Sequence, residues 1–268
     1  MRSFYGQIDS RVRGPYQQML DGQEGEPVSM RSVRHFLPRY VCDRAPGSVL
    51  EVGCGNGRLY RQLRSYGLTG DYAGIEVAEA VIAQNRATHP EATWEATTAY
   101  ELPFASGRFD LCFSLYVLEH LVYPERALRE MLRVLCPGGR LVLVFPDFAA
   151  GGILASQQIG LSPHGTALQK LRAGRLLDAI VSLYDSRLRI RRLLAGAARR
   201  CGPFPVNARP LCLCYPELLA PDVDAVYIAS KVEIEGWAEA GGLGVEYPAG
   251  TDGEMRFQAF MVLTKPGR

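Results

Sequence analysis

The sequence predicts an α/β fold in which helices cover both faces of a parallel sheet. Between residues 46 and 148, short apolar runs alternate with stretches that have helical periodicity. The apolar runs are continuous, as expected of strands that are buried on both sides. The first run, Ser48–Val52, ends at glycines, where the chain turns. Strands that alternate with helices in this way pair in parallel, because each helix returns the chain to the same edge of the sheet.

Five strands and three helices are expected in this zone. The strands are Ser48–Val52, Tyr72–Glu76, Thr93–Ala96, Phe109–Ser114 and Leu141–Phe145, and the helices are Leu59–Tyr66, Ala78–Arg86 and Pro124–Leu135. The last helix has the clearest pattern, because Leu128, Met131 and Leu135 recur at steps of three and four. Pro137–Gly139 then predicts its end.

Composition restricts the class of protein. The 268 residues are 47% hydrophobic and 22% charged with a net charge of +2, which is typical of a soluble domain and not of a general nucleic-acid binder. Seven irregularly spaced cysteines argue against a disulfide framework. The closest pair, Cys212 and Cys214, lacks the spacing of a zinc site, so no metal is expected. The chain shows neither a signal peptide nor a long apolar run, which predicts a cytoplasmic protein.

A glycine-rich loop joins the first strand to its helix. Gly53, Gly55 and Gly57 stand at every second position, so the backbone can turn sharply and approach a ligand closely. The ligand would lie over a helix N-terminus at the carboxyl end of the sheet. Arg58 stands where a dinucleotide loop has its last glycine, and Glu51 would repel a pyrophosphate. A cationic ligand such as S-adenosylmethionine (SAM) therefore fits better.

The loop resembles motif I of the class I SAM-dependent methyltransferases. The resemblance covers residues 48–147 and includes Leu102-Pro103-Phe104, Phe109-Asp110-Leu111, Val117-Leu118-Glu119-His120-Leu121 and Arg133-Val134-Leu135-Cys136-Pro137-Gly138-Gly139. Each piece is common alone, but their order and spacing are specific. The resemblance implies a Rossmann-like fold with SAM as cofactor. It also implies a seven-stranded, mostly parallel sheet, with Gly244–Tyr247 as sixth strand after the helix Val232–Ala240, and Phe257–Thr264 as antiparallel last strand.

The same resemblance implies the cofactor-binding residues. They are Glu51, Gly53, Cys54, Gly55, Glu76, Val77, Thr98, Ala99, Ser114, Leu115 and Tyr116. The first four are expected at the methionine end of SAM, Glu76 at the ribose hydroxyls, Val77 beside the adenine, and the last three near the methionine. Thr98 replaces an acidic residue that relatives use for the adenine, which puts that contact in doubt. Tyr116 fits shielding of the sulfonium and packing in the core equally well.

Two residues are candidate general bases, since an alcohol or amine acceptor can require one. His120 follows the fourth strand and Asp147 the fifth, at the same edge of the sheet. Many relatives carry Glu-His at this point for structural reasons, so a structural role of His120 is favoured, and His164 fits a surface residue. The stretch Ser114–Val117 lacks the Asn/Asp-Pro-Pro-aromatic signature of nucleic-acid amino methyltransferases, and the chain has no Pro-Cys nucleophile. No nucleic-acid acceptor is therefore expected.

The pattern of apolar runs and turn residues divides the chain into four parts. Residues 1–45 would form an N-terminal cap, with a helix at Met30–Tyr40 and Phe4 and Tyr5 either as cap residues or in a frayed tail. Residues 46–148 and 223–268 would form the SAM-binding core, separated by a helical insertion at 149–222. Long insertions of this kind usually shape an acceptor pocket or lid.

The insertion contains a strongly basic stretch, Gln169–Arg200, with nine Lys or Arg against two Asp. Its apolar residues recur at helical steps, which predicts a basic amphipathic helix or helix pair. Three interpretations remain open: a solvated charged face, a surface that meets an anionic acceptor or the inner membrane surface, and an oligomer contact.

A second resemblance concerns the acceptor. Phe204–Asn207, Asp224–Ser230, Glu233–Ile234 and Ala240–Gly242 resemble methyltransferases encoded among polysaccharide and lipid-linked glycan genes. This implies O-methylation of a sugar hydroxyl, or of a phosphate, or of another small-molecule acceptor. Two alternatives are an N-methyltransferase of a natural-product amine and a SAM-binding protein without catalysis.

Overall fold

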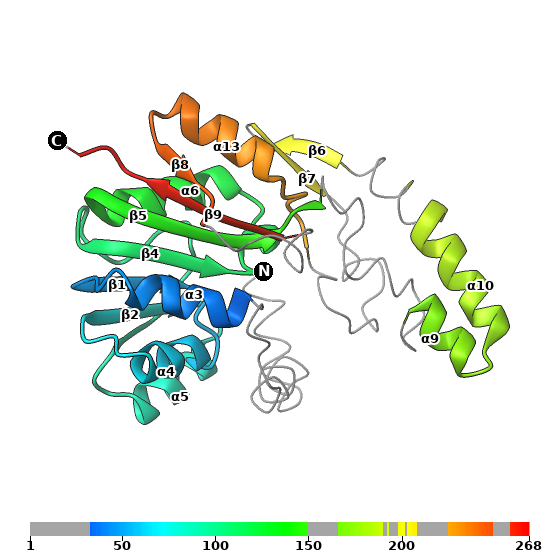
Figure 1. Cartoon of the computed structure of the whole chain (residues 1–268), viewed down its shortest axis with the longest axis horizontal. Helices are drawn as coiled ribbons and strands as arrows, with labels where there is room; N and C mark the ends of the chain where they lie inside the picture. Colours follow the sequence, from blue (N-terminus) through cyan, green and yellow to red (C-terminus); the bar gives the residue numbers. More distant parts are fainter. Residues whose placement is uncertain are drawn as a thin grey trace.

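A seven-stranded sheet organises the chain in the computed structural model, which describes residues 33–148, 166–189, 192, 198–201, 203–207, 225–248 and 258–267. The strand order is β3-β2-β1-β4-β5-β9-β8 (Figure 1). The strands are β1 (Ser48–Val52), β2 (Asp71–Glu76), β3 (Thr93–Ala96), β4 (Phe109–Leu115), β5 (Leu135–Pro146), β8 (Gly244–Glu246) and β9 (Gln258–Thr264). β9 runs antiparallel to β5 and β8, and β1 to β5 pair in parallel. The predicted Rossmann-like α/β fold is confirmed.

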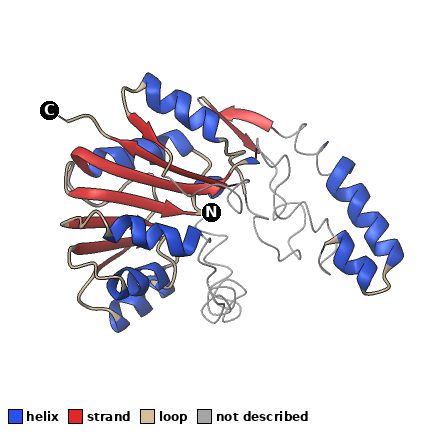
Figure 2. Cartoon of the chain, viewed as in Figure 1, coloured by secondary structure: helices blue, strands red, loops and turns tan. Residues whose placement is uncertain are grey.

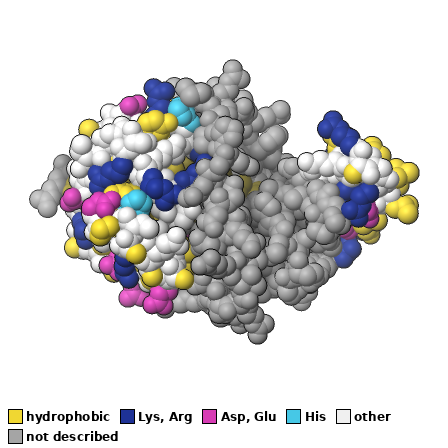
Figure 3. All heavy atoms as spheres, turned by 90° about the horizontal axis from the view of Figure 1, so that it is seen from below, with side chains coloured by type: hydrophobic (Ala, Val, Ile, Leu, Met, Phe, Trp, Pro, Cys, Tyr) yellow, Lys and Arg dark blue, Asp and Glu magenta, His cyan; other side chains and the backbone are white. Residues whose placement is uncertain are grey.

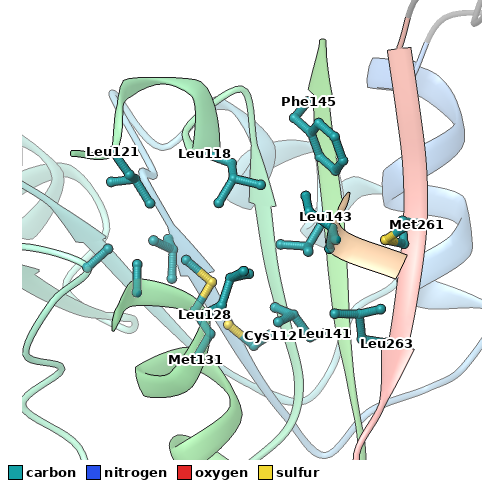
Figure 4. Packing of buried hydrophobic residues seen from close by; sticks show 14 of the residues in the cluster. Cys112, Leu118, Leu121, Leu128, Met131, Leu141, Leu143, Phe145, Met261 and Leu263 are labelled. Atoms are coloured by element: carbon teal, nitrogen blue, oxygen red, sulfur yellow. The ribbon is translucent and has the colours of Figure 1, made fainter. Parts of the chain in front are cut away.

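Helices cover both faces of this sheet (Figure 2). The helices α3 (Val33–Cys42), α4 (Arg58–Ser65) and α5 (Glu79–Thr88) pack on one face, and α6 (Pro124–Val134) and α13 (Lys231–Ala240) on the other. Strand side chains alternate between the two cores: Leu141 and Leu143 of β5 face α6, while Val142 faces α3 and α4. Figure 4 shows the core between the sheet and α6, with Met131 beside Cys112 and Leu141. Each such aliphatic residue contributes roughly 1.5–3 kcal/mol through burial.

Two predicted boundaries near Pro137 differ from the structure. The helix ends at Val134, and β5 begins at Leu135 and continues through Pro137–Gly139, where a turn was expected. Leu135 pairs with Phe109 and Arg140 with Leu111, so the intervening residues form a bulge. Gly138 has a φ of 77°, as the sequence pattern suggests, but its N–H bonds to the Lys265 carbonyl and the strand is not interrupted.

The described part of the insertion contains the helix pair that was one of the two expectations for Gln169–Arg200, but Ala198–Cys201 at its end forms a strand instead of helix. The insertion forms α9 (Ala167–Arg172), α10 (Leu176–Tyr184) and a π-helical turn η2 (Asp185–Arg189), with Gly174 (φ 73°) between the two helices. The segments β6 (Ala198–Cys201) and β7 (Phe204–Asn207) then form an antiparallel hairpin. Phe204 is buried against Tyr227, and Val206 makes a β-bridge to Tyr227. The pairing of β6 with β7 overrides the helical propensity of Ala198–Arg200.

Several expectations lie outside the described residues. These concern Phe4, Tyr5, His164, Cys212 and Cys214. The expected N-terminal helix Met30–Tyr40 corresponds in its described part to α3, which begins at Val33. None of the helices in the described ranges is long and apolar enough to cross a membrane.

Candidate functional site

The glycine loop connects β1 to α4 in a conformation that requires glycine. Gly53, Gly55 and Gly57 have φ values of 80°, 48° and 73°, which L-residues with side chains rarely adopt. A Cβ atom on Gly53 would lie 2.3 Å from Cγ2 of Val117. The Gly53 N–H donates to the Ile75 carbonyl of β2 at 2.8 Å, which anchors the loop. The loop conformation therefore requires glycine, at Gly53 also because a side chain would collide with Val117.

Glu51, on β1 just before the loop, is a buried carboxyl group. Its side chain accepts a hydrogen bond from the Tyr72 hydroxyl of β2. Burial raises the pKa of Glu51 to about 8, the neighbouring Glu76 adds to this rise, and the Tyr72 hydrogen bond opposes it. A cationic group beside Glu51 would favour its ionised form, because opposite charges lower the pKa of a carboxyl group.

Glu76, the last residue of β2, lies against the same loop. Its carboxylate accepts hydrogen bonds from the N–H groups of Gly55 at 3.3 Å and Val77 at 2.7 Å. The predicted residues Glu76, Gly55 and Val77 are thus brought together. The position suits a ribose, whose two hydroxyls can donate to one carboxylate.

Asn85 of α5 is a site residue that the sequence reasoning missed. Its side-chain amide donates to the Gly55 carbonyl at 2.8 Å, and the residue is buried. Asn85 stands four residues after Val81 and three after Ile82, so it lies on the buried face of α5. A polar residue at an apolar position of the helical pattern is the signal that could have identified it.

Cys54 is oriented differently from its neighbours in the loop. Its side chain is buried in the core cluster that contains Tyr72 and Trp94. Burial, with Glu51 and Glu76 as further causes, raises the pKa of its thiol well above the ordinary value. Only the main chain of Cys54 is therefore suited to contact a ligand, and the thiol is unsuited to act as a nucleophile.

The ends of β3 and β4 contribute the remaining predicted residues at the carboxyl edge of the sheet. Thr98 and the buried Ala99 follow β3, and Leu115 ends β4. Ser114 pairs in register with Val52 of β1, which places it beside the start of the glycine loop. Its hydroxyl is buried and has no hydrogen-bond partner among the described residues, so it remains available to a ligand or a water molecule.

Tyr116 is held in a strained backbone conformation at this edge. Its φ is 56°, in the left-handed region, which costs on the order of 1 kcal/mol for a residue with a side chain. Its N–H donates to the Val144 carbonyl at 2.9 Å, and its hydroxyl donates to Gln258 of β9 at 2.8 Å. The ring is therefore fixed across the carboxyl ends of β4 and β5. Gln258 was not identified from the sequence.

The two candidate bases border the segment where the chain returns from the insertion. His120 ends the short helix η1 (Leu118–His120), and its Nε2 lies 3.9 Å from the carboxylate of the fully buried Glu119. The Glu119 carbonyl accepts hydrogen bonds from the N–H groups of Val226 and Tyr227.

Asp147 directly follows β5 and is buried. Burial is the main cause that raises the pKa of Tyr227 and of Tyr247, and the Asp147 carboxylate contributes to both shifts. Asp147 therefore lies near the segment that contains these two tyrosines, on the same side as Glu119 and His120.

Comparisons with known proteins show which part of the chain is similar to a known family. Residues 50–143 match the family model described as a methyltransferase domain. A probable chloroplastic tocopherol O-methyltransferase of Oryza sativa subsp. japonica is 32% identical over 138 residues, which is 45% of this chain and 38% of the relative. Ajmaline N-methyltransferase of Rauvolfia serpentina is 28% identical over 107 residues, which is 38% of this chain and 37% of the relative. The chain thus spans well under half the length of these curated relatives.

A solved structure shares the fold. The SAM-dependent methyltransferase from Mesorhizobium loti superimposes with a TM-score of 0.53 at 16% identity, over 87% of this chain and 96% of that one. At this identity the similarity concerns the arrangement of helices and strands alone.

Proposed function

Since residues 50–143 match the model of a methyltransferase domain and lie in a Rossmann-like sheet, we propose that the protein transfers the methyl group of SAM to a hydroxyl of a sugar or another small-molecule acceptor. One observation carries the cofactor part of this proposal. Two buried carboxyl groups, Glu51 and Glu76, flank a glycine loop at the ends of adjacent strands. This set suits a ligand with positive charge at one end and vicinal hydroxyls further along.

The residues present fit SAM. Glu51 and the main chain of Gly53–Gly55 would hold the cationic methionine end, Glu76 would accept from the ribose hydroxyls, and Thr98 and Ala99 would border the adenine. When bound, the cofactor supplies a methyl group on a positively charged sulfur, which is a good leaving group. The protein must then orient the acceptor and exclude water.

Asp147 and His120 support a hydroxyl acceptor. A hydroxyl loses its proton during methylation, and a nearby carboxylate or imidazole can accept it. Both residues follow strands whose ends adjoin the glycine loop through β4 and β5. The resemblance of residues 204–242 to glycan-modifying methyltransferases favours a sugar among the hydroxyl acceptors.

An amine acceptor is the second candidate, and a specific observation favours it. Asp147 and Glu119 are buried carboxyl groups on the same side of the site, and such groups can pair with a protonated amine. The similarity to an amine-methylating relative is consistent with this alternative.

Transfer of labelled methyl groups tests the proposal. The full chain is incubated with SAM that carries a labelled methyl group and with separate fractions of carbohydrates, glycolipids and amines. We expect label in carbohydrate-containing fractions, in a linkage that resists mild base as a methyl ether does. Label in amines would replace the hydroxyl assignment. A protein that binds S-adenosylhomocysteine but labels no fraction would contradict catalysis.

A further inference from the structure

The hairpin formed by α9 and α10 exposes apolar side chains on its outside. Nine large apolar residues between 166 and 189 are 47% to 77% exposed: Leu168, Leu171, Leu176, Leu177, Ile180, Val181, Leu183, Tyr184 and Leu188. Those on α10 recur mainly at steps of three and four, as residues on one helix face do, and hydrophobic side chains are visible at the right edge of Figure 3. Contiguous apolar surface of this kind marks an interaction site in a soluble protein.

The inside of the same hairpin is polar. Lys170 and Ser182 are fully buried between the helices, and the Lys170 ammonium donates to the Ser182 hydroxyl. Asp185 and Ser186 are also buried. A helix pair that folds against water normally buries its leucines and exposes its lysine. The hairpin has the opposite arrangement, so its outer face is suited to an apolar environment.

The charges on the hairpin indicate which kind of apolar environment its outer face would meet. Among residues 166–189, five Lys or Arg stand against two Asp. Both acids are paired within the hairpin, Asp178 with Arg175 at 2.7 Å and Asp185 with Arg189 at 3.3 Å. Arg172 and Arg187 are exposed beside the exposed Leu171 and Leu188, and neither takes part in these two ion pairs. Apolar side chains next to arginines that lie outside these two ion pairs match a surface with acyl chains below anionic headgroups.

We infer that the α9–α10 hairpin docks the protein on an anionic lipid bilayer, with its exposed leucines inserted below headgroups that bind Arg172 and Arg187. A second copy of the chain fits this face less well, because a symmetric contact would bring two hairpins of the same net positive charge together. The hairpin lies to one side of the sheet in Figure 1, and its outer apolar side chains are exposed. The inference does not depend on which acceptor is methylated.

Sedimentation of the full chain with vesicles tests this inference. Vesicles of phosphatidylcholine with phosphatidylglycerol are compared with phosphatidylcholine alone, at low and high salt. We expect binding to the anionic vesicles that weakens as salt rises, because salt screens the arginine contacts. Replacing Arg172 and Arg187 by Glu should lower the partition coefficient at least about twentyfold, because loss of each arginine contact alone costs about fivefold.

Paired variants separate docking from folding. Leu177→Asp with Ile180→Asp should reduce vesicle binding more than tenfold, whereas Val232→Asp on α13, where Val232 is 65% exposed, should leave it unchanged. All variants should bind S-adenosylhomocysteine like the unchanged protein. Absence of vesicle binding at low salt would overturn the inference, as would equal binding by the Leu177 and Ile180 variant. A dimer that this variant dissociates, without lipid binding, would assign the face to a contact between copies instead.

Discussion

The hydroxyl of Tyr72 on β2 donates a hydrogen bond to the carboxyl group of Glu51 on β1, and both side chains are buried. The bond favours the ionised form of Glu51, whereas burial and the nearby Glu76 favour the neutral form and raise its pKa to about 8. At neutral pH the ligand-free site therefore holds Glu51 mainly as the acid. The ammonium group that SAM and S-adenosylhomocysteine share is stabilised by the carboxylate form, so ligand binding and the ionisation of Glu51 are coupled.

The first prediction concerns the pH dependence of ligand binding. The affinity for S-adenosylhomocysteine should rise with pH and level off above about 8, because binding below that pH must first remove a proton from Glu51. Tyr72→Phe should move the midpoint of this pH dependence to higher pH, since the hydrogen bond that lowers the pKa of Glu51 is lost. Calorimetric titrations over a pH series measure both effects. Tyr60→Phe, which removes a hydroxyl bonded to Glu91, is the matched control. A midpoint that Tyr72→Phe leaves in place would refute the coupling.

The second prediction concerns the stability of the ligand-free protein. The pKa of Glu51 is raised in the folded state, so the folded protein retains a proton that the unfolded chain releases. The contribution of Glu51 protonation to the free energy of unfolding is fully present below pH 4.5, and it is lost as the pH rises toward about 8. Glu51→Gln should therefore raise the unfolding temperature at pH 8 by several degrees while weakening SAM binding. Thermal unfolding at low and high pH checks this; a variant less stable than the original at high pH would contradict the buried-acid interpretation.

The third prediction concerns the glycine loop. Gly53→Ala forces a φ of 80° on an alanine and brings its Cβ to 2.3 Å from Val117. We expect the free energy of unfolding to fall by roughly 1–3 kcal/mol. Binding of S-adenosylhomocysteine should no longer be detectable. Gly236→Ala, in α13 with no atom within 4 Å of the added carbon, should be neutral or stabilise by about 0.5–1 kcal/mol. Unfolding and binding measurements on the two variants compare them directly, and equal behaviour would show that the loop tolerates a side chain.

The fourth prediction distinguishes the two candidate bases. If Asp147 accepts the proton of a hydroxyl acceptor, Asp147→Asn should lower kcat by about 10²–10⁴-fold and leave S-adenosylhomocysteine affinity unchanged. His120→Gln should then reduce kcat less and keep the pH profile. The opposite ranking would assign the proton transfer to His120. Little change in either variant would contradict a role of both residues in proton transfer.

The sequence predicted the core of the fold well because its signals are local. Strand Ser48–Val52 coincides with β1, and the alternation of strands and helices through residues 46–148 is preserved. Elements that depend on pairing with residues far away in sequence could not be predicted. The β6–β7 hairpin exists through contacts of Phe204 and Val206 with Tyr227, and no local pattern encodes that partner.

The same distinction applies to the site. Glu51, Gly55 and Glu76 were identified because each adjoins a strand end in a recognisable order, and the structure brings Gly55 and Glu76 into hydrogen-bond contact. Asn85 and Gln258 were missed because their roles depend on backbone and side-chain partners far away in sequence. The side chain of Cys54 points into the core, a direction that the motif alone does not fix.

Calorimetric titration of the full chain with S-adenosylhomocysteine, alongside Glu76→Gln, tests the central claim most directly. The account predicts saturable binding to the unchanged protein and at least a tenfold loss of affinity in Glu76→Gln, because charge-assisted bonds to the ribose hydroxyls are weakened. Glu79→Gln, in the first turn of α5, should bind like the unchanged protein. No heat with correctly folded protein, or equal affinity in Glu76→Gln, would contradict the assignment of this strand edge as the cofactor site.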